Sequence, residues 1–75
     1  MKIMGFVDTD TYTEYHFDSW EKMAQAVLQM SEKYHDYTRF LPYCNGWNLD
    51  YPEPGEDVVE YTARLVDMAI GLQLI

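Results

Sequence analysis

The chain has 75 residues, which is enough for one domain and no more, so we expect a single domain over residues 1–75. Thirteen Asp and Glu stand against five Lys and Arg, and the net charge of −8 argues against direct binding to nucleic acids or to anionic membranes, since both attract Lys and Arg. Hydrophobic residues make up 48% of the chain and aromatic residues 16%, which excludes intrinsic disorder.

Two short β-prone runs open the chain. Residues 3–7 are followed by residues 12–17, and the polar residues 8–11 between them favour a turn, because their side chains bond their own backbone. This pattern predicts an antiparallel hairpin. Tyr15 and Phe17 share one face of the second run, and we expect that face to point inward, against the apolar residues of the first run.

A first helix is predicted from Asp18 or Ser19 to about residue 37. Asp18 and Glu21 have the spacing of a capping box. Apolar positions then recur in steps of three and four along one stripe: Trp20, Met23, Ala24, Val27, Met30 and Tyr34. Pro42 sets a limit that the helix cannot pass.

The middle of the chain contains a turn and a short strand. Asn45-Gly46 is typical of a turn. Trp47, Leu49 and Tyr51 then alternate with polar residues, which suits a short third strand. The two prolines that follow prevent the strand from continuing.

A second helix is predicted over about residues 56–72. A pair at i,i+4, Glu60 and Arg64, would add a few tenths of a kcal/mol. The expected buried stripe contains Val58 or Val59, Thr62, Leu65, Val66, Ala69 and Leu72. The order β-β-α-(β)-α predicts an α+β fold, in which two helices pack on a small antiparallel sheet.

Groups that could carry catalysis or hold a metal are few. A thiol nucleophile or a zinc site would need Cys44 beside His16 or His35, but these residues lack a diagnostic local signature and the close ligand spacing of metal sites. Residues 8–10 begin like a calcium loop, yet its sixth-position glycine and twelfth-position glutamate are missing. We therefore expect no enzymatic activity, no cofactor and no metal.

The sequence also favours one cellular compartment. The apolar start, residues 1–7, is too short for a signal peptide, and no run approaches the ~20 apolar residues of a membrane span. A single cysteine, Cys44, cannot form an internal disulfide, which fits a reducing environment. We expect a protein of the cytoplasm, and of the host cytoplasm if a phage encodes it.

The acidic residues are segregated along the sequence. Five acids and no Lys or Arg lie between Lys2 and Lys22, and five more acids lie between Arg39 and Arg64. Such segregation costs stability through self-repulsion. Solubility is one explanation; a basic protein surface as partner is the other, because a carboxylate row on a helix through Glu56 and Glu60 has a spacing similar to that of nucleic-acid phosphates.

Aromatic residues are interleaved with these acids. They are Tyr12, Tyr15, Trp47, Tyr51 and Tyr61. Tyrosine and tryptophan anchor interfaces because they bring a large contact area and a polar tip at low entropy cost. Beside the acids, this set indicates a protein-binding surface, although any one tyrosine could fill the core.

A segment after the turn resembles a known family. Asn45-Gly46-Trp47-Asn48 is followed by Tyr51 and by the acids Asp50, Glu53, Glu56 and Asp57. This stretch and the order of the elements resemble a small anti-CRISPR family, the phage-encoded DNA mimics that inhibit the type II Cas nuclease. The resemblance implies that Tyr51 and Glu53 enter the nuclease site that reads the short DNA motif beside the target. The next acid of the family falls on Pro54, where this chain departs from it.

Two functions follow as hypotheses. The first is an acidic inhibitor, an anti-CRISPR or other phage anti-defence protein, that blocks a basic nucleic-acid-binding site by charge mimicry. The second is an antitoxin, an immunity-type protein or a homodimer without mimicry, because residues 68–75 are strongly apolar and Asp50-Tyr51-Pro52 is similar to a segment of colicin-type immunity proteins. The expected partner-binding residues are Asp50, Tyr51, Glu53, Glu56, Asp57, Glu60, Asp8, Asp10, Glu14 and Trp47.

Overall fold

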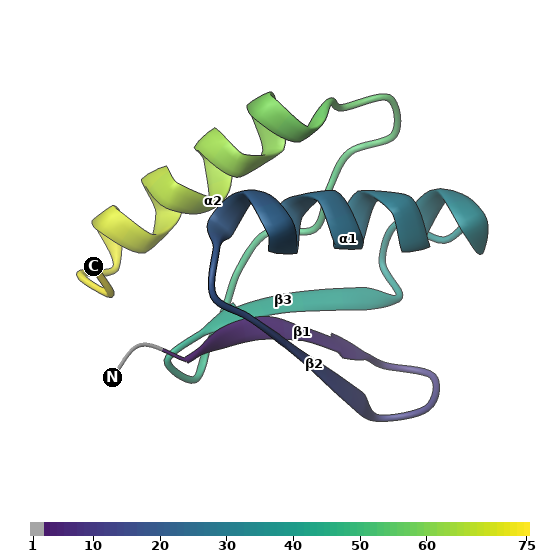
Figure 1. The fold of residues 1–75 in the computed structure, drawn as a ribbon, viewed down its shortest axis with the longest axis horizontal. Coiled ribbons are helices and arrows are strands. Elements are labelled where there is room, and N and C mark those ends of the chain that lie inside the picture. Colours follow the sequence, from purple (N-terminus) through teal and green to yellow (C-terminus); the bar gives the residue numbers. More distant parts are fainter. Residues whose placement is uncertain (1–2) are drawn as a thin grey trace.

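Four antiparallel strands form one sheet, and a helical layer covers one of its faces (Figure 1). The computed structural model describes residues 3–75. Its elements are β1 (Met4–Asp8), β2 (Thr13–Phe17), α1 (Trp20–Lys33), β3 (Phe40–Cys44), β4 (Trp47–Asn48) and α2 (Val58–Gly71). The strand order across the sheet is β2-β1-β3-β4. The predicted α+β class is confirmed.

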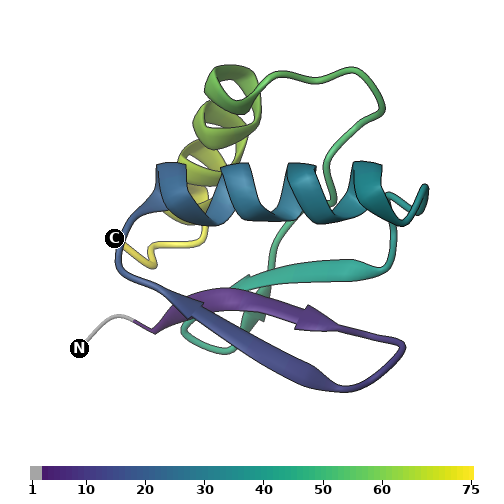
Figure 2. The ribbon, with the colours of Figure 1, turned by 45° about the vertical axis from the view of Figure 1, so that its right-hand side comes forward.

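The helical layer has two parts. α1 lies directly over the sheet, and α2 runs obliquely across α1, where its inner side completes the core (Figure 2). The segment that joins β4 to α2 climbs from the sheet to the top of this layer (Figure 1). This segment therefore lies beside the helices, away from the exposed face of the sheet.

The N-terminal hairpin forms with the predicted inner face. Met4 pairs with Phe17 and Phe6 with Tyr15, so the apolar side chains of the two strands share one side of the sheet. The ring of Phe6 stacks on Tyr15, with centroids 4.8 Å apart, and on Phe17 at 5.5 Å. Gly5 lies so close to β2 that a Cβ there would overlap the Tyr15 carbonyl oxygen, so only glycine fits.

Helix α1 begins as predicted and ends earlier. Ser19 is the N-cap, and its side chain accepts the Lys22 backbone N–H. The helix ends at Lys33, because His35 has a φ of +53° and turns the chain back toward the sheet. The prediction that the helix continues to about residue 37 was wrong, and Tyr34 is exposed.

A strand that the sequence analysis did not predict lies inside the sheet. β3 pairs with β1 and β4, and it buries Phe40, Pro42 and Cys44 on the helix side. Pro42 has no N–H to donate, but its carbonyl accepts the Leu49 N–H at 2.8 Å. The sequence analysis treated this proline only as a helix limit.

The predicted turn at residues 45–46 is confirmed, whereas the strand after it is shorter than predicted. Asn45 and Gly46 have φ values of +49° and +85°, as a tight two-residue hairpin loop requires. The Asn45 side chain accepts the Ile3 N–H at 2.8 Å. β4 contains only Trp47–Asn48, since the chain leaves the sheet at the buried Leu49.

Helix α2 starts two residues later than predicted, with Asp57 as its N-cap. The Asp57 carboxylate accepts the Glu60 N–H at 2.8 Å. Leu65 and Ala69 are buried as predicted, but the third fully buried position is Tyr61, which the sequence analysis placed on a binding surface. The regular carboxylate row through Glu56 and Glu60 does not form, because Glu56 precedes the helix.

Candidate protein-binding site

The chain between β4 and α2 is folded around one arginine. We name residues 50–57 the acidic segment. The Arg64 guanidinium donates to both carboxylate oxygens of Glu56, at 2.8 and 2.7 Å, and to the Tyr51 carbonyl at 2.9 Å. A weaker contact, 3.4 Å, joins it to the Asp50 carboxylate. Arg64 therefore pairs with residues before the helix, and the geometry differs from the predicted pair with Glu60.

The pair of Glu56 and Arg64 is largely shielded from water. The Glu56 side chain is only 7% exposed and that of Arg64 34% exposed. The hydrogen bonds from Arg64 lower the pKa of Glu56, and those same bonds raise the pKa of Arg64. Both groups are charged at neutral pH, so the charge of Glu56 serves the fold and is not offered to a partner.

Further bonds hold the acidic segment in one conformation. The buried Tyr61 hydroxyl donates to the Asp50 carbonyl at 2.8 Å. Inside the segment, the Glu53 N–H donates to the Glu56 carboxylate at 3.0 Å. Gly55 supplies the left-handed backbone, φ +83°, that closes the loop. Tyr61 and Arg64 therefore hold the start of the segment, and Arg64 and the cap at Asp57 hold its end, so the segment is ordered before any partner binds.

The other carboxylates of this region are exposed, although that of Asp50 also contacts Arg64 and that of Asp57 caps α2. Asp50, Glu53, Asp57 and Glu60 are exposed. Together with Glu56 they give five negative charges against the one positive charge of Arg64, a net charge of −4. A side-chain hydrogen bond with Asp57, and the negative charge of Asp57, raise the pKa of Glu60. The hydrogen bond from the Glu60 N–H lowers the pKa of Asp57, so the charge of Asp57 is favoured at the N-cap while it disfavours the charge of Glu60.

Of the three hairpin acids predicted to form a second patch, Asp8 is not available to a partner, while Asp10 and Glu14 are exposed. Asp8 is buried, and its two carboxylate oxygens accept from Arg39 at 2.9 and 3.0 Å. The hydrogen bond from Arg39 lowers the pKa of Asp8 from 3.8 to about 2. Asp10 also lies near this guanidinium, at 3.6 Å, while Glu14 is exposed on β2 beside His16. Asp8 is a structural residue because its charge is already matched.

Trp47 and Tyr51 differ in what they offer to a partner. Trp47 is 57% exposed on β4, next to the turn at residues 45–46. Figures 1 and 2 show the chain rising from the sheet after β4 to the top of the helical layer, so Trp47 lies at the sheet end of this path, three residues before Asp50. Tyr51 is half-buried within the acidic segment, where its carbonyl accepts from Arg64.

Sequence reasoning missed the two arginines that organise these acids. Arg39 and Arg64 border the second stretch that lacks Lys and Arg. Arg39 pairs with acids of the hairpin, and Arg64 pairs with acids inside the stretch. Their position at the borders of acidic stretches is the only sequence signal. Long-range pairing cannot be deduced from it, because Asp8 and Arg39 are 31 residues apart.

Cys44 and the two histidines do not gather into a reactive site. Cys44 is fully buried in β3, and His16 lies exposed on β2, where its ring meets Tyr43 with centroids 6.3 Å apart. His35 is exposed after α1. Within residues 3–75, no three His, Cys, Asp or Glu side chains converge as metal ligands would.

Comparison with known proteins does not add a family. No protein-family model matches the chain, and neither a curated protein nor a solved structure is significantly similar to it. In the described part of the chain, neither helix is both long enough and apolar enough to span a membrane.

Proposed function

We propose that this protein is an acidic inhibitor that occupies the cationic nucleic-acid-binding site of another protein, with the acidic segment and Glu60 as its contact surface. One observation carries the proposal: three exposed carboxylates of the acidic segment and a fourth, that of Glu60 in the first turn of α2, surround an ion pair that ties the segment to the helix, and together these groups have a net charge of −4. A preorganised cluster of negative charges can take the place of phosphates in a groove that is lined by Lys and Arg.

Preorganisation favours binding over mere solubility as the role of these acids. A mobile acidic loop would keep the protein dissolved equally well, whereas a loop that must enter a site gains affinity when its ordering cost is met during folding.

A type II Cas nuclease is the first target class to test. The resemblance of residues 45–57 to an anti-CRISPR family motivates this choice, and that family inserts the residues matching Tyr51 and Glu53 into the nuclease. Here Glu53 is exposed on the acidic segment while Tyr51 is half-buried, so Glu53 is the stronger candidate contact. Such an inhibitor would act in the cytoplasm of the host cell.

The direct test is competition with DNA. A panel of guide-loaded type II Cas nucleases is mixed with a fluorescent target duplex, and anisotropy reports DNA binding as the protein is added. We expect displacement near equimolar concentration for at least one nuclease. No displacement across the panel at a large molar excess contradicts the assignment to this target class.

A pair of matched variants separates the mechanism from general charge. The test variant combines Asp50→Asn, Glu53→Gln and Asp57→Asn; Asn can still cap α2. The control removes the same three charges from the hairpin and its exit: Asp10→Asn, Glu14→Gln and Asp18→Asn. We expect the test variant to displace DNA at least about tenfold less well, and the control to match the wild type within about twofold. Equal losses contradict a localised contact surface.

A further inference from the structure

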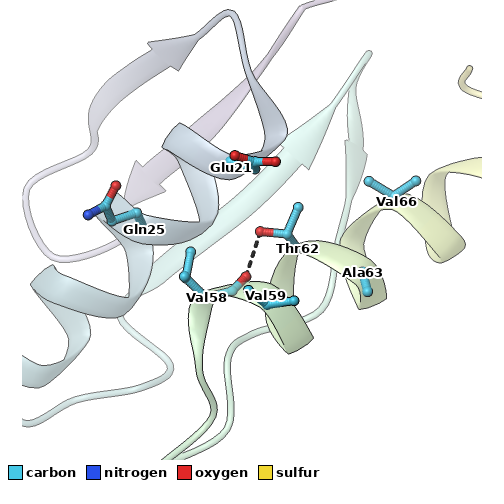
Figure 3. A pocket seen from close by; sticks show the side chains of 7 residues that line it. All are labelled: Glu21, Gln25, Val58, Val59, Thr62, Ala63 and Val66. Atoms are coloured by element: carbon cyan, nitrogen blue, oxygen red, sulfur yellow. Dashed lines mark hydrogen bonds between the residues drawn. The ribbon is translucent and has the colours of Figure 1, made fainter.

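A groove between the two helices presents a second surface with different chemistry (Figure 3). Its volume is about 450 Å³. The α2 wall is apolar and contains Val58, Val59, Ala63 and Val66. The opposite wall comes from α1. This groove does not include residues 50–57.

The apolar wall continues as a stripe along the exposed side of α2. Val59, Ala63, Val66 and Ile70 follow one another in steps of four, three and four residues, which places them on one side of a helix. Val59 is 75% exposed and Ile70 56% exposed. The stripe spans 11 residues, about 16 Å along the axis. Since the buried residues of α2 lie on another side, this helix is apolar on two sides.

Acidic residues border the stripe. Glu60 and Asp67 are exposed on its flank that faces away from α1, and they are seven residues apart, so they lie on one line along the helix. Across the groove, Glu21 of α1 lies opposite Thr62 (Figure 3). The Thr62 hydroxyl is not free to face a ligand, because it donates to the Val58 carbonyl at 2.6 Å.

Positive charges are directed away from this surface. Arg64, the basic residue of α2, is bound to Glu56. On α1, the helical period of about 100° per residue places Lys22 and Lys33 about 100–120° around the helix from Glu21, on its outer side. Lys22 is also paired with Asp18 at 3.5 Å. The apolar stripe therefore lies between Glu60 and Asp67 on one side and Glu21 on the other.

We propose that this groove and stripe bind a basic amphipathic helix of a partner protein. Apolar side chains at helical spacing on the partner would pack against the groove and stripe. Lys or Arg on the flanks of the partner helix would pair with Glu60 and Asp67 on one side and with Glu21 on the other. Helix-in-groove recognition works through this combination of spaced apolar anchors and charge matching. Apart from Glu60, which borders both surfaces, this proposal uses other residues than the nucleic-acid mimicry above and does not depend on it.

A second copy of this chain fits the surface less well. An antiparallel pairing of two α2 stripes would bring Glu60 of one copy close to Asp67 of the other. Like charges across an interface oppose association. The acidic residues on both sides of the stripe therefore favour a positively charged partner over a second copy of this chain.

The experiment uses a defined probe. A fluorescent 16-residue peptide carries Leu at positions i, i+4, i+7 and i+11 and Lys on both flanks, and a second peptide has the same composition in scrambled order. We expect saturable binding of the ordered peptide in anisotropy, at least about tenfold tighter than the scrambled one, a difference of 1.4 kcal/mol. In ¹⁵N spectra, amide shifts should concentrate on residues 59–70 and 21–25.

Single substitutions locate the site. Ile70→Ser and Val59→Ser should each weaken binding of the ordered peptide several-fold, because each removes an apolar anchor. Ile3→Ser is the matched control, since Ile3 is exposed to a similar degree, 51%, but lies outside the stripe; it should leave binding unchanged. Circular dichroism confirms that each variant is folded.

Two results would overturn the proposal. Equal binding of the ordered and scrambled peptides would mean that charge alone attracts them. Sedimentation equilibrium that shows a dimer of the wild type, and a monomer for Ile70→Ser, would mean that the stripe is a contact between two copies. Failure here leaves the DNA-competition test unaffected, because neither triple variant of that test changes a residue of the groove or the stripe.

Discussion

Replacing Arg64 by Met tests whether the acidic segment depends on its buried ion pair. The substitution keeps the aliphatic stem but removes the donors to Glu56 and to the Tyr51 carbonyl. Removing one partner of a buried pair costs about 3–5 kcal/mol. Because Arg64 is 34% exposed and water can enter, we expect a smaller loss than for a fully buried pair, about 2–3 kcal/mol. For a domain of this size the melting temperature should fall by roughly 10–20 °C.

The double variant Arg64→Met with Glu56→Gln identifies the cause of that loss. If an unpaired buried carboxylate is the main penalty, removing its charge should restore part of the stability, so the double variant should unfold at a higher temperature than Arg64→Met alone. Urea denaturation followed by circular dichroism at pH 7 gives the free energies of unfolding for the four proteins of the cycle. A loss below about 0.5 kcal/mol for Arg64→Met, as for an ordinary surface substitution, refutes the role assigned to this pair.

Three further predictions address the rest of the fold. The pKa of Asp8 is lowered from 3.8 to about 2, so its contribution to stability is complete above about pH 4 and is lost as the pH falls toward 2; the urea midpoint should drop over this window, and Asp8→Asn should flatten the drop. Gly5→Ala should destabilise by about 1–3 kcal/mol or more, because the new Cβ would overlap a backbone carbonyl of β2, whereas Gly71→Ala meets no atom and should be neutral or stabilising in the same melt. Ser31 is fully buried and its hydroxyl finds no hydrogen-bond partner among residues 3–75, so Ser31→Ala should raise the free energy of unfolding by about 1 kcal/mol, and an unchanged or lower value would show that the hydroxyl is satisfied.

Local patterns were sufficient to predict the class of the fold. Alternation in residues 12–17 and the three-and-four spacing after Ser19 each describe one element whose burial is decided by nearby residues. β3 was missed for a physical reason. Its run, Phe40–Cys44, contains a proline, and whether a proline fits a strand depends on where the partner strands lie. That information is not local to the sequence.

The candidate site was predictable only in part. Asp50, Glu53, Asp57 and Glu60 are exposed and near one another in sequence, as expected. Asp8 looked equivalent in the sequence, but β3 pairs with β1 so that Phe40 lies opposite Asp8, and this brings Arg39 within hydrogen-bonding distance of Asp8. Tyr61, which was expected on the binding surface, is part of the core. Composition gives the number of charges, but only the tertiary structure decides which charges are paired. Arg39 neutralises Asp8 in the hairpin, whereas Arg64 neutralises one acid of the acidic segment and leaves the others without a matching positive charge.

The association rate constant as a function of ionic strength tests the central claim most directly. It would be measured by stopped flow with a nuclease whose DNA binding the protein blocks, for the wild type and for the two triple variants. We predict that added salt slows the wild type and the hairpin control alike, by at least about tenfold between low and physiological salt, while the variant at residues 50, 53 and 57 starts slower and changes much less. Identical salt dependence for the two variants would contradict the claim that this loop carries the recognition.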